Sequence, residues 1–134
     1  MKPLKIYVAG RYTNKLGVRA IQKELVCAGH SITHDWTTTD GLQVPAYRRA
    51  NYEADCALKD LCGVREADAL VLLDEPGCLG AYIDVGYAIA EAVPFIVMLP
   101  ARDSIFYRLA KAVLHSYNIS HLLQELSTIE PRKR

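Results

Sequence analysis

The chain has 134 residues, of which 51% are hydrophobic and 23% are charged. These values are ordinary for a globular protein and predict a single domain, residues 1–134, with a core large enough to fold alone. The net charge of +1 gives no broad basic field, so the composition argues against a nucleic-acid partner. We interpret the one cationic run, at residues 132–134, as a solvated tail.

Nothing in the sequence indicates a targeting or membrane-spanning segment. The apolar stretch at residues 6–9 is too short for a signal sequence or a membrane span. The four cysteines have neither CxxC spacing nor histidines at zinc-ligand intervals, and unpaired thiols are typical of a reducing compartment. We therefore expect a cytoplasmic protein with no membrane partner, no metal and no cofactor.

The chain begins with a strand and a helix. Residues 5–9 are rich in β-forming side chains, and Asn14, in the polar turn that follows, is a good N-cap. The helix that starts there closes at Gly29, and residues 30–35 contain a second short strand. The apolar stripe expected to face the core consists of Leu16, Ala20, Ile21, Leu25 and Val26.

A loop and a long helix occupy the middle of the chain. Residues 37–44 have no hydrophobic periodicity and predict a loop of the kind that often borders a binding site. Pro45 suits a helix start, and residues 46–66 are helix-prone. Gly63 could divide that helix in two.

The second half of the chain continues the alternation. Residues 69–73 are continuously apolar and predict a fully buried strand, which a helix over residues 80–92 and a fourth strand over residues 94–99 follow. The remaining expected elements are a short helix over 104–110, a strand over 113–115 and a helix over 119–126.

This alternation predicts an α/β fold. Inner strands without a period-two pattern are typical of a parallel sheet that helices cover on both faces. Right-handed crossovers then give a doubly wound, five-stranded sheet in flavodoxin-like order, within three α/β/α layers. In such sheets ligands bind at the edge where the carboxyl ends of the strands meet.

Two segments at that edge carry candidate ligand-binding residues. After the first strand, Gly10 would let the backbone approach a ligand, while Arg11, Tyr12 and Lys15 add charge and an aromatic ring. This arrangement suits a phosphate or carboxylate, although a tight turn with two solvated cations fits equally, and GxGxxG and Walker patterns are absent. After the third strand, the glycine-rich segment 74–90 includes Gly80.

Four further side chains have both a structural and a functional interpretation. Asp84, near the start of the helix after the third strand, is either a helix-start acid or a catalytic group. Tyr7 is a core residue or holds a carboxylate, Asp60 lies on a solvated helix face or reaches the site, and Trp36 packs in the core or stacks on a flat ring. We interpret His34 as structural. Two acids and a flat platform fit the cleavage of an N-glycosidic bond.

Three segments in the right order resemble the nucleoside 2-deoxyribosyltransferase-like superfamily, and within it the 2′-deoxynucleoside 5′-phosphate N-hydrolases. They are residues 5–10, residues 60–71, and residues 79–88 followed by Pro94. The resemblance implies that Tyr7 orients the nucleophile, that Asp60 contacts or protonates the base, and that Gly10 and its neighbours hold the sugar or 5′-phosphate. It also implies a homo-oligomer, with a neighbouring subunit completing the site from the stretch after Pro100.

Asp84 departs from the family pattern, which has a glutamate at the nucleophile position. Aspartate is one methylene shorter, and misplacement by about 1 Å can cost on the order of a hundredfold in rate. Asp84 could act covalently, could stabilise an oxocarbenium ion, or could have lost the chemistry. The sequence therefore predicts an N-glycosidase or deoxyribosyltransferase acting on a (deoxy)nucleoside or its 5′-monophosphate, with a non-catalytic nucleotide-binding or sequestering module as the alternative. A signalling receiver or flavin carrier fits poorly.

Overall fold

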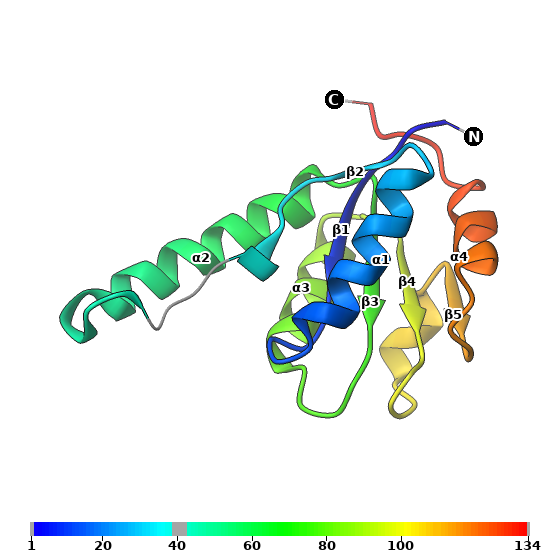
Figure 1. Cartoon of the computed structure of the whole chain (residues 1–134). Helices are drawn as coiled ribbons and strands as arrows, with labels where there is room; N and C mark the ends of the chain where they lie inside the picture. The colour runs from blue at the N-terminus through cyan, green and yellow to red at the C-terminus, as the bar shows by residue number, and fades with distance from the viewer. Residues whose placement is uncertain (1, 39–42, 134) are drawn as a thin grey trace.

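The computed structural model describes residues 2–38 and 43–133. Its five strands form one parallel sheet in the order β2-β1-β3-β4-β5, which confirms the doubly wound, flavodoxin-like prediction (Figure 1). The strands are β1 (Lys5–Ala9), β2 (Ser31–Ile32), β3 (Ala69–Leu73), β4 (Phe95–Met98) and β5 (Ala112–Leu114).

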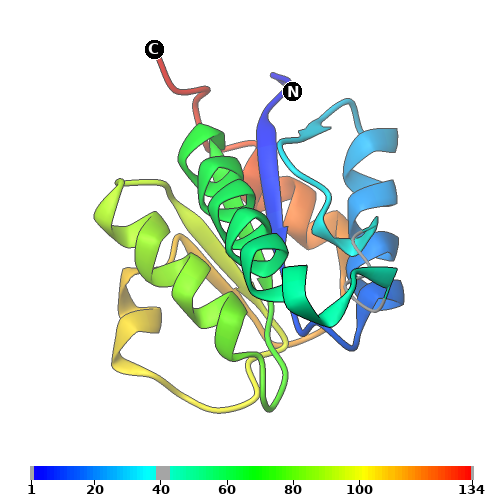
Figure 2. The same cartoon turned by 90° about the vertical axis from the view of Figure 1, so that its left-hand side faces the viewer.

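Helices cover both faces of the sheet (Figures 1 and 2). One face carries α1 (Lys15–Cys27) and α4 (Ile119–Leu126), and the other carries α2 (Ala46–Glu66), α3 (Leu79–Ala90) and the 3-10 segment η3 (Ile105–Leu109); a second 3-10 segment, η1 (Trp36–Thr38), follows β2. No helix in residues 2–38 and 43–133 is long and apolar enough to cross a membrane. Because all strands run in parallel, the loops after β1, β3 and β4 meet at one edge, the lower edge in Figure 1.

The core lies around the two central strands. Every residue of β3 is buried, and so are residues 6–9 of β1. Both strands are apolar on their two faces because helices pack against the sheet from both sides.

The first helix begins as expected but presents a different stripe to the core. Asn14 caps α1, since its side-chain oxygen accepts a hydrogen bond from the Gly17 N–H at 3.1 Å. The predicted stripe is wrong in part, because Leu16, Ala20 and Val26 are exposed. The face of α1 that packs against the sheet includes a polar residue, Gln22. Its side-chain amide donates a hydrogen bond to the carboxylate of Asp35. The buried residues are Val18, Ile21, Gln22 and Leu25.

The long helix is continuous, which corrects the expectation that Gly63 divides it. Only Gly63 and Val64, near its carboxyl end, are fully buried, while its first half extends away from the sheet (Figure 1). Of the loop predicted over residues 37–44, Thr37 and Thr38 belong to η1, and residues 39–42 lie outside the described residues.

The cationic run near the carboxyl terminus is not simply a solvated tail. The backbone N–H of Arg132 donates to Asp68 at 2.7 Å, and its guanidinium donates to the carbonyl oxygens of Arg65, Ala67 and Glu91. These carbonyls lie at or just past the ends of α2 and α3, where helices leave acceptors without intrahelical partners. Arg132 is therefore bound to the folded domain, through contacts that the composition of the sequence does not reveal.

We expect Gly63→Ala to destabilise the fold by about 1–3 kcal/mol. A Cβ at this position would lie 2.8 Å from the Cβ of His34 and 3.0 Å from Cδ2 of Tyr7. The result tests the packing, because helix propensity alone predicts that alanine would increase the free energy of unfolding, by up to about 1 kcal/mol. Urea unfolding monitored by circular dichroism would measure it, and a more stable variant would contradict the described contact.

Candidate active site

A pocket of about 220 Å³ opens at the edge where the strands end. It is bordered by the carboxyl end of β1, by η1, by α2 and by the start of α3. Of the residues predicted for the site, Arg11 and Lys15 do not line this pocket, and the structure brings the others together there: Tyr7, Gly10, Tyr12, Trp36, Asp60, Gly80 and Asp84.

Arg11 lies at the rim of this pocket instead of lining it. Its side chain is exposed, and its guanidinium approaches to 3.7 Å from the position that a Cβ on Gly77 would occupy. Gly77 has φ +84°, a conformation that favours glycine. Gly10 has a packing reason to be glycine, since a Cβ there would meet the side chain of Val18 at 2.5 Å.

Asp84 points from the second turn of α3 into the protein. It is buried, and the hydroxyl of Tyr7 donates to its Oδ2 at 3.4 Å. Tyr7 is itself fully buried in β1. Tyr7 is thus a core residue whose hydroxyl also contacts the buried acid.

Burial and the nearby charge of Asp60 together raise the pKa of Asp84 to about 7, while the hydrogen bond from Tyr7 acts in the opposite direction. Burial and the same two carboxylates raise the pKa of Tyr7. Tyr7 therefore remains a hydrogen-bond donor across the pH range in which Asp84 ionises.

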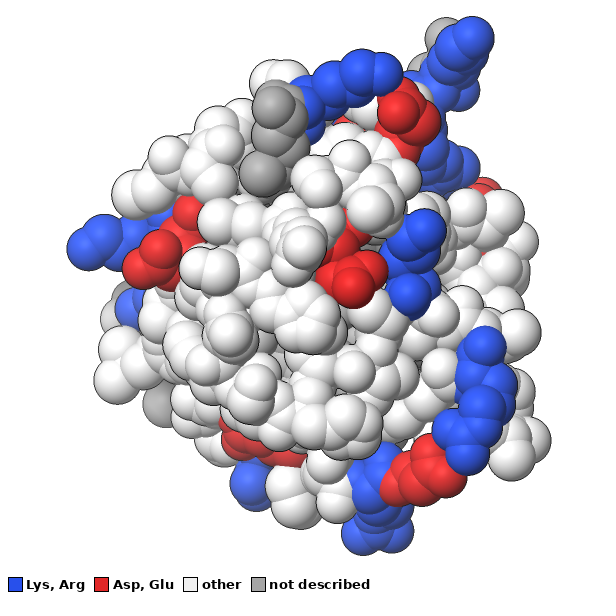
Figure 3. Space-filling view, turned by 90° about the vertical axis from the view of Figure 1, so that its right-hand side faces the viewer, with Lys and Arg blue, Asp and Glu red and all other residues white. Residues whose placement is uncertain are grey.

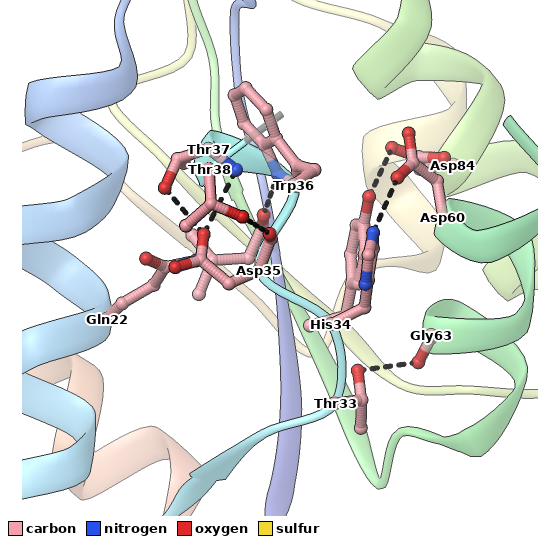
Figure 4. Close-up of polar contacts among 12 residues, drawn as sticks. Gln22, Thr33, His34, Asp35, Trp36, Thr37, Thr38, Asp60, Gly63 and Asp84 are labelled. Atoms are coloured by element: carbon pink, nitrogen blue, oxygen red, sulfur yellow. Dashed lines mark hydrogen bonds and ion pairs between the residues drawn. The ribbon is translucent and has the colours of Figure 1, made fainter. Parts of the chain in front are cut away.

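Asp60 reaches the pocket from α2 and faces His34, as Figure 4 shows. Its Oδ1 lies 3.3 Å from Nε2 of His34. Burial raises the pKa of Asp60, and His34 acts in the opposite direction. The contact with His34 thus opposes the raised pKa of Asp60, whereas the pKa of Asp84 is raised to about 7, and this difference favours Asp84 as the carrier of the proton of the pair.

The interpretation of His34 as purely structural missed this contact. The available signal was its position, since His34 lies two residues after the end of β2 and so belongs to the edge where the other candidates meet. Its neighbour Thr33 fixes that segment, because the Thr33 hydroxyl donates to the carbonyl of Gly63 at 2.7 Å.

An aromatic wall forms another side of the pocket. Trp36 is anchored by a hydrogen bond from its Nε1 to the carbonyl of Val8 at 2.8 Å. The ring of Tyr12 stacks against it, with centroids 6.5 Å apart, and Lys15 Nζ lies 4.5 Å from the centroid of Tyr12. Asp35 holds the turn by accepting from the backbone and hydroxyl of Thr37 and from Gln22 (Figure 4).

Sequence reasoning also missed Asp74, a buried acid directly after β3. Its carboxylate accepts from the hydroxyls of Tyr82 at 2.6 Å and Tyr107 at 2.7 Å, and from the backbone N–H of Ala101 at 3.0 Å. The thiol of Cys78 also donates to it at 3.5 Å. Asp74 thereby joins the loop before α3 to the segment after β4 and fixes the α3 end of the pocket.

Comparison with known proteins supports the fold but gives no close relative. No protein-family model matches the sequence, and no curated protein matches it. A solved structure of 2-deoxyribosyltransferase from the psychrotolerant bacterium Bacillus psychrosaccharolyticus matches with a TM-score of 0.62 and 15% identity, covering 96% of this chain and 99% of that one. The chain has the fold of a 2-deoxyribosyltransferase. Within the described residues no group of three His, Cys, Asp or Glu side chains is placed to hold a metal ion.

Removing the charge of Asp60 should lower the pKa of Asp84 below about 7, because that charge is one of its two raising causes. Carboxyl ¹³C NMR titration of Asp60→Asn against the wild type measures the shift. Asp55→Asn, at an exposed position on the same helix, is the matched control and should leave the titration unchanged. An Asp84 pKa unchanged in Asp60→Asn would show that the two acids do not interact.

Asp84→Asn should be more stable than the wild type at pH 8 and not at pH 4. The pKa of Asp84 is raised in the folded protein, so the folded state binds the proton more tightly and the wild type loses stability as the pH rises from about 4 to about 7. Asparagine escapes that loss, which amounts to about 2–4 kcal/mol. Thermal unfolding at both pH values checks this, and a gain independent of pH would contradict it.

Proposed function

We propose that the protein cleaves the N-glycosidic bond of a (deoxy)nucleoside or of its 5′-monophosphate. The observation that carries the proposal is the meeting of two interacting carboxyl groups, Asp84 and Asp60, beside the aromatic wall of Trp36. The shared fold with a 2-deoxyribosyltransferase supports it. We further infer a cytoplasmic homo-oligomer.

The reaction assigns one acid to each end of the breaking bond. As the bond between the sugar carbon and the base nitrogen breaks, its electron pair leaves with the base, and Asp60 gives that base a proton. The carboxylate of Asp84 either bonds to the positive sugar carbon or stabilises it until an acceptor attacks. The acceptor is water or a second base, and it returns a proton to Asp60.

The remaining residues bind and orient. Tyr7 holds Asp84 by its hydroxyl. Trp36 and Tyr12 offer flat rings to a base. Gly10, Gly80 and the start of α3 present backbone to the sugar or a 5′-phosphate, and Arg11 at the rim adds positive charge for a phosphate.

In the free protein the surroundings of the two acids favour the protonation state opposite to the one that this reaction needs. Asp84 must ionise and Asp60 must be protonated, whereas the burial of Asp84 and the contact between Asp60 and His34 favour the reverse. Positive charge at the sugar carbon lowers the pKa of Asp84, so a bound substrate corrects the distribution as the bond breaks.

The same observation favours a second candidate function. A protonated Asp84 is a hydrogen-bond donor, which suits the binding of an intact sugar, and the shorter side chain withdraws it from the sugar carbon. On this alternative the protein binds or sequesters a nucleotide without turnover.

Incubation with a panel of nucleosides, deoxynucleosides and their 5′-monophosphates, followed by chromatography for free base, tests the proposal. We expect release by the wild type, a loss of at least about a thousandfold in Asp84→Ala, and no change in Asp55→Ala. Because the pair must hold one proton, with Asp84 ionised and Asp60 protonated, the profile of kcat/KM against pH should be bell-shaped and should fall above about pH 7, where the pair loses that proton.

The other outcomes separate the candidates. Base release at the wild-type rate by Asp84→Ala would contradict the assigned role. Binding of an intact nucleotide, measured by calorimetry, without any release would select the sequestering function. Activity gained in Asp84→Glu would then show that the length of the side chain silences the site.

A further inference from the structure

His34 and Asp60 face each other through two buried atoms. Nε2 of His34 lies 3.3 Å from Oδ1 of Asp60 (Figure 4). Neither of these atoms has another hydrogen-bond partner within the described residues. Buried polar atoms are nearly always paired, so each atom is the partner of the other. The pair is satisfied when Nε2 carries a proton and Oδ1 accepts it.

The packing of two segments builds this contact. Asp60 and Gly63 are three residues apart in α2 and therefore lie on the same side of that helix. The Cβ of His34 packs against Gly63, since a Cβ on the glycine would lie 2.8 Å from it. The segment around His34 is held on both sides, because the hydroxyl of Thr33 donates to the backbone of α2 and the indole of Trp36 donates to the backbone of β1. The imidazole is thereby directed at Asp60.

The two side chains reach different surroundings. Asp60 lines the pocket of the candidate site, and its side chain is 30% exposed although Oδ1 is buried. Oδ2 is therefore the oxygen that a ligand in the pocket meets. His34 does not line that pocket, yet its side chain is 24% exposed although Nε2 is buried. The accessible part of the imidazole thus lies outside the pocket, and Nδ1 is the nitrogen left to exchange protons with water.

We propose that His34 relays protons between water and Asp60, so that the acid of the site consists of two residues. The proposal rests on the proposed function, because it concerns the proton that Asp60 gives to the base. A substrate that fills the pocket separates Oδ2 from water, whereas the path through Nδ1, Nε2 and Oδ1 stays open behind Asp60. His34 touches no substrate and acts through Asp60.

The relay moves one proton at each of its atoms. As the bond between the sugar carbon and the base nitrogen breaks, its electron pair leaves with the base, and Oδ2–H of Asp60 gives the base a proton. Nε2–H of His34 then gives a proton to Oδ1, and Nδ1 takes one from water. When the acceptor attacks the sugar carbon, its proton passes to Oδ2. Oδ1–H returns a proton to Nε2, and Nδ1–H releases one to water, which restores both residues.

This sequence keeps Asp60 uncharged throughout the reaction. Without a relay, the departure of the base would leave a carboxylate at Asp60 in a pocket that the products still fill, and a charge shut off from water is costly. With the relay, the side chain of His34 only changes from one neutral tautomer to the other. The relay therefore explains why a partly buried acid has an imidazole behind it.

The variant His34→Gln separates the relay from a purely electrostatic role. Its amide still donates a hydrogen bond to Oδ1, but it carries no charge and cannot pass a proton on. The imidazole lowers the pKa of Asp60, so an electrostatic role alone predicts faster base release by the variant near neutral pH. The relay predicts slower release, by about tenfold to a hundredfold. This is less than the roughly 10²–10⁴ that a whole general acid contributes, because Asp60 remains.

Single-turnover base release in mixtures of H₂O and D₂O measures the relay itself. Several protons move together in a relay, so the rate should follow a curve against the deuterium fraction in the wild type and a straight line in His34→Gln. His121→Gln is the matched control and should behave like the wild type. His121 is exposed on α4, across the sheet from α2, on a side of the molecule where Figure 3 shows mostly uncharged side chains.

Three results would overturn the relay. They are base release by His34→Gln that is as fast as in the wild type or faster, the same curve in both proteins, and a straight line in the wild type, which needs no variant. Circular dichroism of His34→Gln should match the wild type, which excludes unfolding as the cause of slower release.

A titration distinguishes this proposal from the proposed function. Carboxyl ¹³C NMR should give a higher pKa for Asp60 in His34→Gln than in the wild type, because the charge and the hydrogen bond of the imidazole lower it. The other titratable groups that interact with Asp60, Tyr7 of β1 and Asp84 of α3, are unchanged in the variant. An unchanged pKa would overturn the proton contact even if base is released. A raised pKa without base release from any substrate leaves that contact in place and refutes the proposed function instead.

Discussion

The structure depends on a carboxyl group held out of water. Asp84 lies on the inner side of α3, where the hydroxyl of Tyr7 is its hydrogen-bond donor. Because the acid is buried there, its pKa is raised to about 7, and the group exchanges its proton near neutral pH. Destabilising charge of this kind is tolerated where a site needs it, since the same burial that weakens the fold strengthens electrostatic interactions with a ligand.

The second acid, Asp60, lies in different surroundings from the buried Asp84. Asp60 is less buried than Asp84 and faces His34, so the two carboxyl groups lie in different environments. Pairs of acids that their surroundings separate in this way can divide the roles of acid and nucleophile. In this protein the separation favours the proton on Asp84, and the proposed reaction therefore requires the substrate to redistribute it.

The inward position of the acid also determines what α3 shows to the outside. With its one charge directed inward, α3 has an uncharged outer face, and η3 extends that face with further apolar side chains. Asp74 fixes η3 against α3 through Tyr82 and Tyr107. Site and surface are thus two sides of one helix.

The sequence by itself determined the fold and most of the pocket. Alternating strands and helices with apolar inner strands lead to a doubly wound sheet, and such a sheet brings the residues after each strand to one edge. Tyr7, Gly10, Trp36 and Asp84 meet for this reason. Only the tertiary structure decided the phase of α1, the contact of His34 with Asp60, and the direction in which the apolar side chains of α3 point. An analysis of hydrophobic periodicity assigns apolar residues of a helix to the core. Their real position depends on which face of the helix packs against the sheet, and contacts between segments far apart in the chain determine that face.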